Sequence, residues 1–279
     1  MFDLDSSEHV FIADHRVGTS GLLSTVMSLE ALAEAATLVC GWDSVDEVSS
    51  VSVGRPLFVP DGERRQTTAE VLGEGEGATA TLSSISLDHA GKVQHLSAVL
   101  RPRLAWSGDA ARREMPPGQG RSGAASSEIY RLYFHGPSFQ VVDSAYVVDD
   151  SVVAYMAQEL APIGEPAGRS RTSPRLVELC LQAAGLYEVA ASGRMRIPSS
   201  IERIVWHSPD RRDSGDGLAA VVERVLDEDG EPAYDAAVID LDGRVRLSVF
   251  GYRATDFSQP VDQVALADVR SALGPVGSG

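Results

Sequence analysis

The chain has 279 residues, of which 43% are hydrophobic and 23% are charged, and its mean hydropathy is −0.06. This composition is typical of a soluble globular protein with enough apolar material for one large domain or two fused small ones. The formal net charge of −16 argues against nucleic acid as a partner, because phosphate binding requires a clustered positive surface.

The N-terminus and the two cysteines indicate a cytoplasmic protein. Residues 1–5 have neither the basic nor the apolar segment of a signal peptide. Cys40 and Cys180 lie far apart within apolar helical patterns, which favours buried thiols in a reducing compartment over a disulfide. The most apolar run, residues 22–40, is interrupted by two glutamates, so it predicts a core helix and not a membrane span.

The first half of the chain predicts a long helix followed by antiparallel strands. Residues 9–12 favour a short strand that leads to His15. Apolar side chains then recur at helical spacing from about residue 24 to residue 39, and Ser24 or Thr25 can cap this helix. β-rich runs separated by Gly, Pro and Asp turns follow at residues 45–53, 66–72, 78–87 and 93–101. Because the helix is largely apolar, we expect these strands to wrap around it as a sheet.

The second half repeats this plan after a stretch rich in Gly, Pro, Arg and Ser, residues 105–127, which we expect to be an exposed linker. Residues 129–134 are expected to be an extended approach to a Gly136-Pro137 turn, and Ser173-Pro174 predicts the start of a helix that ends near residue 191. Strands are expected at residues 141–148, 151–159, 201–207, 218–227, 233–240 and 245–255. The predicted fold class is α+β, with one hot-dog unit at residues 1–104, a second at 128–257 and a flexible tail at 258–279.

Four motifs occur in an order that characterises one family. His15 opens the first, although the usual Gly and Pro of that motif are Thr19 and Ser24 here. The second is residues 135–140, with the sequence His-Gly-Pro-Ser-Phe-Gln, where the usual first residue is Tyr. The third is residues 173–182, and the fourth is the Leu-Pro motif, which reads Ile197-Pro198 here. On these motifs, residues 8–256 resemble the dehydratase domains of type I polyketide synthases, including iterative ones, and this resemblance implies a double hot dog.

The third motif carries a departure from this family. Glu178 stands where the family has a catalytic Asp, and Gln182 lies one helical turn later on the same face. The resemblance implies that His15 is the base and Glu178 the acid in the removal of water from a 3-hydroxyacyl thioester. We expect apolar surroundings to raise the pKa of the Glu178 carboxyl, so that it stays protonated near neutral pH. The implied supporting residues are Gln182, His135, Gly136 and Pro137, with the Gly136 amide region polarising the thioester carbonyl.

The resemblance also implies partners. The substrate would be carried on the phosphopantetheine arm of an acyl carrier protein, with no other cofactor and no metal, and neighbouring synthase domains would adjoin the chain. Dimerisation through the N-terminal strand is a further implication. Carrier proteins are usually acidic and so is this chain, so docking needs a local basic patch. The candidates are Arg169, Arg171 and Arg175.

Two alternatives remain open at this point, because the replaced Asp, Gly and Pro of the motifs bear directly on the geometry of the site. The same side chains could serve a different reaction, either thioester hydrolysis or the cyclisation of a polyketide. The chain could also be a catalytically silent domain that binds or shields an acyl chain. The mass of the product distinguishes loss of water from release of a free acid or an isomass ring. His15→Ala and Glu178→Gln distinguish both reactions from a silent domain, whose binding they would leave unchanged.

Overall fold

The computed structural model describes residues 1–85, 91–102, 111–114, 116, 123–164, 170–207, 217–227, 229–257 and 260–276. Strands of the first half are β1 (Phe2–Asp5), β4 (Glu47–Val53), β6 (Arg64–Glu74), β7 (Gly77–Ile85) and β8 (Lys92–Arg101). Those of the second half are β9 (Ala124–Ala125), β10 (Val142–Val148), β11 (Ser151–Met156), β12 (Arg196–Trp206), β13 (Ala219–Leu226), β14 (Pro232–Ile239) and β15 (Val245–Asp256).

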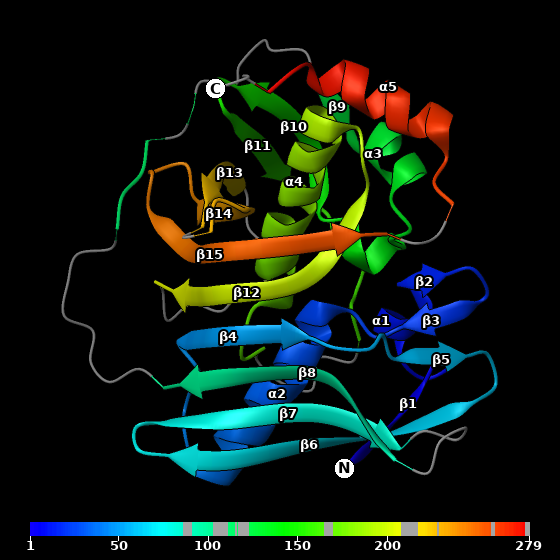
Figure 1. Ribbon diagram of the computed structural model, residues 1–279, viewed down its shortest axis with the longest axis vertical. Helices are drawn as coiled ribbons and strands as arrows, with labels where there is room; N and C mark the ends of the chain where they lie inside the picture. Colours follow the sequence, from blue (N-terminus) through cyan, green and yellow to red (C-terminus); the bar gives the residue numbers. More distant parts are fainter. Residues whose placement is uncertain are drawn as a thin grey trace.

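These strands form a single antiparallel sheet that runs through both halves (Figure 1). Its strand order is β1-β6-β7-β8-β4-β12-β15-β14-β13-β11-β10-β9. The halves meet where β4 pairs with β12, with Val51 opposite Ile201 and Glu47 opposite Val205. A small second sheet, formed by β2 (Arg16–Val17), β3 (Ser20–Leu22) and β5 (Phe58–Pro60), lies beside the first half.

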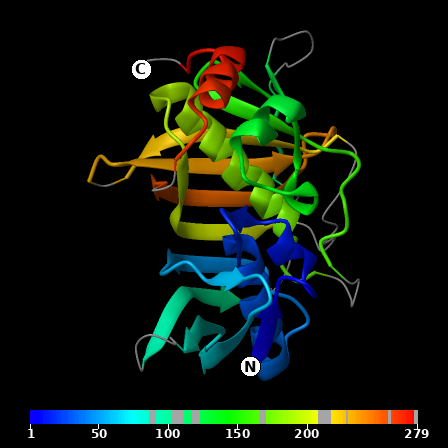
Figure 2. The ribbon, with the colours of Figure 1, turned by 90° about the vertical axis from the view of Figure 1, so that its right-hand side faces the viewer.

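Each half of the sheet curls around its own central helix (Figures 1 and 2). Helix α2 (Thr25–Cys40) packs against β6, β7 and β8, and helix α4 (Pro174–Ser192) packs against strands β10 to β15. The two helices also contact each other, and one cluster of buried apolar side chains extends through both halves. This is the predicted double hot-dog arrangement.

The start of α2 was predictable from local chemistry, and the start of α4 only in part. The Ser24 hydroxyl accepts a hydrogen bond from the Met27 amide at 3.3 Å, as expected for an N-cap. Ser173 occupies the N-cap position of α4 with Pro174 at the first helical position, but its side chain makes no capping bond. Its φ of 47° lies in the left-handed region, so this turn must be held by contacts from elsewhere.

Two short segments expected to be extended are helical. Residues 9–12 contribute to helix α1 (Val10–Ala13), and residues 129–134 overlap helix α3 (Ser126–Leu132). In α3 the Glu128 carboxylate accepts a hydrogen bond from the Ala125 amide at 2.8 Å, which satisfies a donor at the helix start. The run of β-formers in both segments was therefore a misleading signal, because local capping and packing outweighed it.

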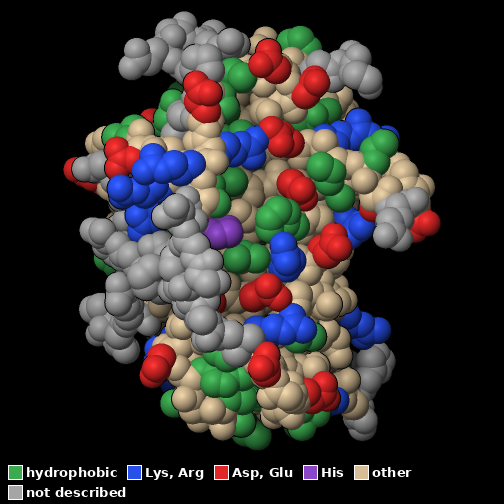
Figure 3. All heavy atoms as spheres, turned by 90° about the vertical axis from the view of Figure 1, so that its left-hand side faces the viewer, with side chains coloured by type: hydrophobic (Ala, Val, Ile, Leu, Met, Phe, Trp, Pro, Cys, Tyr) green, Lys and Arg blue, Asp and Glu red, His purple; other side chains and the backbone are tan. Residues whose placement is uncertain are grey.

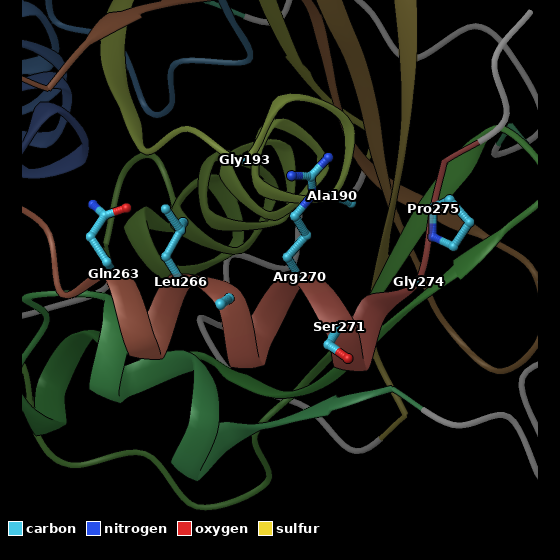
Figure 4. A pocket seen from close by; sticks show the side chains of 9 residues that line it. Ala190, Gly193, Gln263, Leu266, Arg270, Ser271, Gly274 and Pro275 are labelled. Atoms are coloured by element: carbon cyan, nitrogen blue, oxygen red, sulfur yellow. The ribbon is translucent and has the colours of Figure 1, made fainter.

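Part of the expected flexible tail is an ordered helix, α5 (Gln263–Leu273). The Asp262 side chain caps it by accepting hydrogen bonds from two backbone amides, and its buried residues recur at helical spacing (Ala265, Leu266, Val269 and Leu273). Helix α5 packs against α3 and α4, and Arg270 points toward Gly193 at the C-terminal end of α4 (Figure 4). A cation at that end is favourable for the helix dipole of α4.

The linker lies partly outside the described residues, namely at 103–110, 115 and 117–122. Its described residues 111–114 are mostly exposed, and the amide of Val245 donates to the carbonyl oxygen of Ala111 at 2.8 Å. Strand β9, inside the expected linker, pairs with β10 and belongs to the second half. No helix in the described ranges has the length and hydropathy needed to cross a bilayer.

Candidate active site

His15 lies between α1 and β2, and its backbone forms an isolated β-bridge with His135 from the second half. Its Nδ1 lies 2.8 Å from the carbonyl oxygen of Leu22. Because a carbonyl oxygen only accepts hydrogen bonds, Nδ1 carries the hydrogen and Nε2 of the neutral ring keeps its lone pair. Burial, followed by the nearby charge of His135, lowers the pKa of His15 to about 4, against a smaller opposing effect of Glu178. His15 is therefore neutral at physiological pH.

The turn at residues 136–138 is fixed by hydrogen bonds to Asp14, the residue before His15. The Gly136 amide donates to the carbonyl oxygen of Asp14 at 2.5 Å, and the Ser138 amide donates to Asp14 Oδ2 at 2.9 Å. A Cβ atom at Gly136 would lie 2.8 Å from the Cα of Asp14, so only glycine fits here. The Gly136 N–H itself is already engaged by Asp14. The expected role of the amide region around Gly136 in polarising a thioester stays a prediction. Pro137 is exposed and starts the 3₁₀ turn η1 (Pro137–Phe139).

Glu178 lies in the second turn of α4, where its Oε1 atom has two partners. His135 Nε2 lies 3.1 Å from Oε1, and Gln182 Nε2 donates to the same atom at 2.8 Å. Gln182 is itself fixed, because its Nε2 donates to the Phe139 carbonyl at 2.9 Å and its Oε1 accepts from the Tyr130 hydroxyl at 2.8 Å. The i, i+4 spacing thus brings Gln182 to the carboxyl as the sequence predicted.

The electrostatics of Glu178 differ from the sequence-based expectation. Burial alone would raise the pKa of this carboxyl. The hydrogen bond and charge of His135, the charge of His15 and the hydrogen bond from Gln182 outweigh burial and lower the pKa. The expectation that burial raises the pKa of the Glu178 carboxyl is therefore wrong, because a basic partner, His135, lies within its apolar surroundings.

His15, His135, Glu178 and Gln182 all line one cavity of about 170 Å³. Both halves of the chain contribute to it, and most of its wall is apolar, including Leu22, Leu23, Phe58, Leu181, Met195 and Tyr252. The two predicted catalytic side chains therefore meet in one apolar cavity between the halves. A separate hollow of about 550 Å³ lies between α5 and the end of α4 (Figure 4), and the four side chains are not part of it.

A buried glutamate of α2 holds the segment before α4. Glu30 accepts hydrogen bonds from the Arg171 amide at 2.6 Å and from the Thr172 amide at 2.8 Å, and also from the Thr172 hydroxyl. On the other side, Trp206 Nε1 donates to the Thr172 carbonyl at 2.8 Å. These contacts hold the left-handed turn at Ser173 and so determine where the helix that carries Glu178 begins.

The three arginines predicted to dock a carrier protein have different surroundings. Arg169 lies outside the described residues. Arg171 is half-buried, and its Nη1 donates to the Asp43 carbonyl at 3.3 Å. Arg175 is only 8% exposed and donates to the Ala161 carbonyl, so its assignment to a solvent-facing patch is wrong. On the face drawn in Figure 3, basic side chains are interspersed with acidic ones.

Comparison with known proteins identifies the family. The family described as "Polyketide synthase dehydratase N-terminal domain" matches residues 109–264, more than half of the chain, and "Polyketide synthase dehydratase domain" matches residues 2–85. The chain belongs to the polyketide synthase dehydratase family. This dehydratase-family domain is also 25% identical over 223 residues to a polyunsaturated fatty acid synthase chain of Thraustochytrium sp. (strain ATCC 26185 / S-3). The match covers 75% of the chain but only 8% of that relative's length.

Solved dehydratase domains share the fold of this domain. The dehydratase domain from the CurF module of the curacin polyketide synthase superposes with a TM-score of 0.74 at 17% identity, covering 92% of this chain and 91% of that chain. A trans-AT polyketide synthase dehydratase domain from Brevibacillus brevis gives a TM-score of 0.72 at 19% identity, covering 92% and 93%. The double hot-dog fold class predicted from the sequence is thereby confirmed.

Several side chains that shape the site of this dehydratase-family domain were not predicted. Asp14, Tyr130 and Glu30 act through contacts with residues far along the chain. An Asp directly before the motif histidine and a glutamate inside an apolar helix are the sequence signals that point to two of them. Within the described ranges, no group of three or more His, Cys, Asp or Glu side chains could hold a metal ion.

Proposed function

We propose that this domain removes water from a 3-hydroxyacyl thioester carried on the phosphopantetheine arm of an acyl carrier protein, giving an enoyl thioester. The observation that supports the proposal is the meeting of His15 and Glu178, from different halves, in one apolar cavity. An elimination of this kind needs one group that accepts a proton and one that donates a proton on either side of the reacting carbons.

In the proposed steps, the two side chains act only by accepting and donating protons. Nε2 of neutral His15 takes a proton from the α-carbon, the electrons of that C–H bond form the new double bond, and the C–O bond of the β-hydroxyl breaks. The step uses the protonated form of the Glu178 carboxyl, which is the minor form at neutral pH because the contacts to His135 and Gln182 lower the pKa of this group. That proton passes to the departing oxygen, which leaves as water. His15 then carries one extra proton and Glu178 has lost one, so returning that proton from His15 to Glu178 restores the site.

The apolar wall of the cavity supports the assignment of His15 as the base and Glu178 as the acid. With water excluded, the charges that develop on His15 and Glu178 interact strongly, and a reactive intermediate is protected from side reactions. Because the chain spans 8% of its polyunsaturated fatty acid synthase relative, we propose that it works as one part of a multidomain synthase. Its partners would be a carrier protein and the neighbouring catalytic domains, and no cofactor beyond the phosphopantetheine arm enters the proposed steps.

The test is to load a 3-hydroxyacyl group on a carrier protein and to follow its mass with time. We expect the loss of one water from the wild-type substrate. His15→Ala and Glu178→Gln should lower the rate by a factor of about 10² to 10⁴, the usual contribution of a positioned acid or base. Two matched controls outside the cavity, His9→Ala and Glu74→Gln, should retain the wild-type rate. Release of a free acid would indicate hydrolysis. An unchanged mass would indicate either a cyclisation or a silent binding domain, and only the cyclisation would be abolished in His15→Ala and Glu178→Gln.

A further inference from the structure

His135 has an unusual position in this site, because it contacts both proposed catalytic side chains. Its Nε2 lies 3.1 Å from Glu178 Oε1, and its ring centroid lies 5.2 Å from that of His15. The ring stacks on Phe134, with centroids 5.0 Å apart and an interplanar angle of 11°. Its Nδ1 is buried and has no hydrogen-bond partner among the described residues. The imidazole is therefore held in place by stacking and by a single polar contact, the one to Glu178.

Only one oxygen of the Glu178 carboxyl, Oε1, has polar partners among the described residues. Oε1 receives both His135 and Gln182, whereas none of the residues that the structure describes donates to Oε2. Since Glu178 lines the cavity, Oε2 is the oxygen left for a ligand there. Two polar contacts on Oε1 thus fix the rotation of the carboxyl and determine which oxygen faces a substrate.

His135 and Glu178, the two residues in contact, both differ from the residues that are usual at these positions of the family's motifs. Glu178 is one methylene longer than the Asp usual at its position, and the imidazole of His135 is shorter than the phenol of the usual Tyr. Nε2 of His135 and Oε1 of Glu178 lie 3.1 Å apart in this pair, so shortening the acid by a methylene or replacing the imidazole by a longer phenol alters the contact. A misplacement of about 1 Å in a catalytic group can lower a rate about a hundredfold.

We propose that His135 is a positioning residue matched in length to Glu178, and that the pair together places Oε2 toward the substrate hydroxyl. The inference rests on the proposed dehydration for its catalytic consequence, but the coupling between the two side chains is independent of the reaction. His135 acts through Glu178 and does not itself touch the reacting atoms.

A double-mutant cycle tests the match. The four proteins are the wild type, Glu178→Asp, His135→Tyr and the double variant, compared by kcat for water loss from the carrier-bound substrate. Glu178→Asp should lower kcat about a hundredfold, and His135→Tyr should also lower it, by about tenfold or more. The double variant, which restores both family residues, should recover to within about tenfold of the wild type. Losses that multiply in the double variant would overturn the proposal, as would an unchanged kcat in Glu178→Asp.

A spectroscopic measurement tests the same pair without turnover. His135 lowers the pKa of Glu178 through its hydrogen bond and its charge. ¹³C-detected titration of the Glu178 carboxyl should therefore show a pKa that rises in His135→Tyr, which keeps only a donor, and rises further in His135→Phe, which keeps neither. His95→Tyr, which replaces a buried histidine bonded to Ser84 and the Arg55 carbonyl, is the control and should leave the titration unchanged.

The two proposals can fail separately. If the wild type leaves the mass of the 3-hydroxyacyl carrier unchanged, the proposed function fails, and the carboxyl titration alone decides whether His135 and Glu178 are coupled. If water is lost but the pKa of Glu178 is the same in all three His135 proteins, the matched pair fails and the dehydratase assignment stands. Thermal unfolding of each variant shows that the compared proteins are folded.

Discussion

Glu30 of α2 accepts hydrogen bonds from both the amide and the hydroxyl of Thr172, which lies two residues before α4. The helix of the first half thus holds the start of the helix of the second half. The carboxylate also binds the Arg171 amide, so its removal would leave several buried donors without a partner. The position of Glu178 depends on a residue that lies nowhere near it in the sequence.

We expect Glu30→Ala to lower the free energy of unfolding by at least about 3 kcal/mol, because it removes the acceptor of three donors and each donor left unsatisfied costs about 1–3 kcal/mol. Glu30→Gln keeps one acceptor oxygen and should lose about half as much. Chemical denaturation measures both. Glu34→Gln, one turn further along α2, is the matched control, and equal stabilities of Glu30→Ala and Glu34→Gln would contradict the assignment.

Acid conditions should destabilise the fold through His15. Its pKa is lowered from 6.5 to about 4 in the folded protein, so the unfolded chain binds more protons between these pH values. The stability is fully retained above about pH 6.5 and falls as the pH decreases toward 4, by up to about 3 kcal/mol from this residue. The free energy of unfolding of His15→Gln should therefore depend less on pH in this range. His9→Gln, outside the cavity, should follow the wild-type curve.

Tyr130→Phe should weaken catalysis without touching the substrate. Burial raises the pKa of the Tyr130 phenol, so its hydroxyl stays protonated, donates to Gln182 Oε1 and accepts from the Val142 amide at 2.7 Å. Its loss removes the partner of Gln182 Oε1 and leaves one buried amide unpaired, while Gln182 Nε2 keeps its contacts to Phe139 and Glu178. We expect kcat to fall about tenfold with KM nearly unchanged. Tyr155→Phe, on a surface away from the cavity, is the control, and equal kcat values for the two variants would contradict this chain of contacts.

Carrier-protein docking through the remaining basic residues gives a separate prediction. Arg171→Glu and Arg169→Glu should raise KM for a carrier-bound substrate about tenfold, and the effect should diminish at high salt. A small pantetheine thioester, which lacks the carrier protein, should show no change in KM. Arg101→Glu, on β8 of the first half, is the control. A similar rise for both substrates would place these arginines at the cavity entrance and not at a docking surface.

The sequence predicted the parts of the fold that have strong local signals. Helices α2 and α4 and most strands of the described sheet show apolar periodicity over many residues, which tertiary contacts reinforce. The short strands β1 and β9 were not predicted. Helices α1 and α3 were mistaken for extended chain because a few β-forming residues say little without knowledge of the capping contacts. Helix α5 was missed because its apolar face is completed only by packing against α3 and α4.

The site was predictable in its positions but not in its electrostatics. The motifs identified His15, Glu178 and Gln182 as residues of one site, and the structure places all three in one cavity, His15 from the segment after α1 and the other two from α4. The pKa direction of Glu178, the engaged amide of Gly136 and the burial of Arg175 depend on neighbours from distant segments. No local pattern encodes them.

The pairing of β4 with β12 has a consequence for how this protein can be divided. If the two halves were produced as separate polypeptides, each would present a bare strand edge and the exposed flank of its central helix to solvent. Such fragments should self-associate when alone and recombine when mixed, and elimination activity should return only with the mixture. The junction of the two halves, which forms the proposed active site, is thus also the surface that must stay covered for the protein to remain monomeric in its parts.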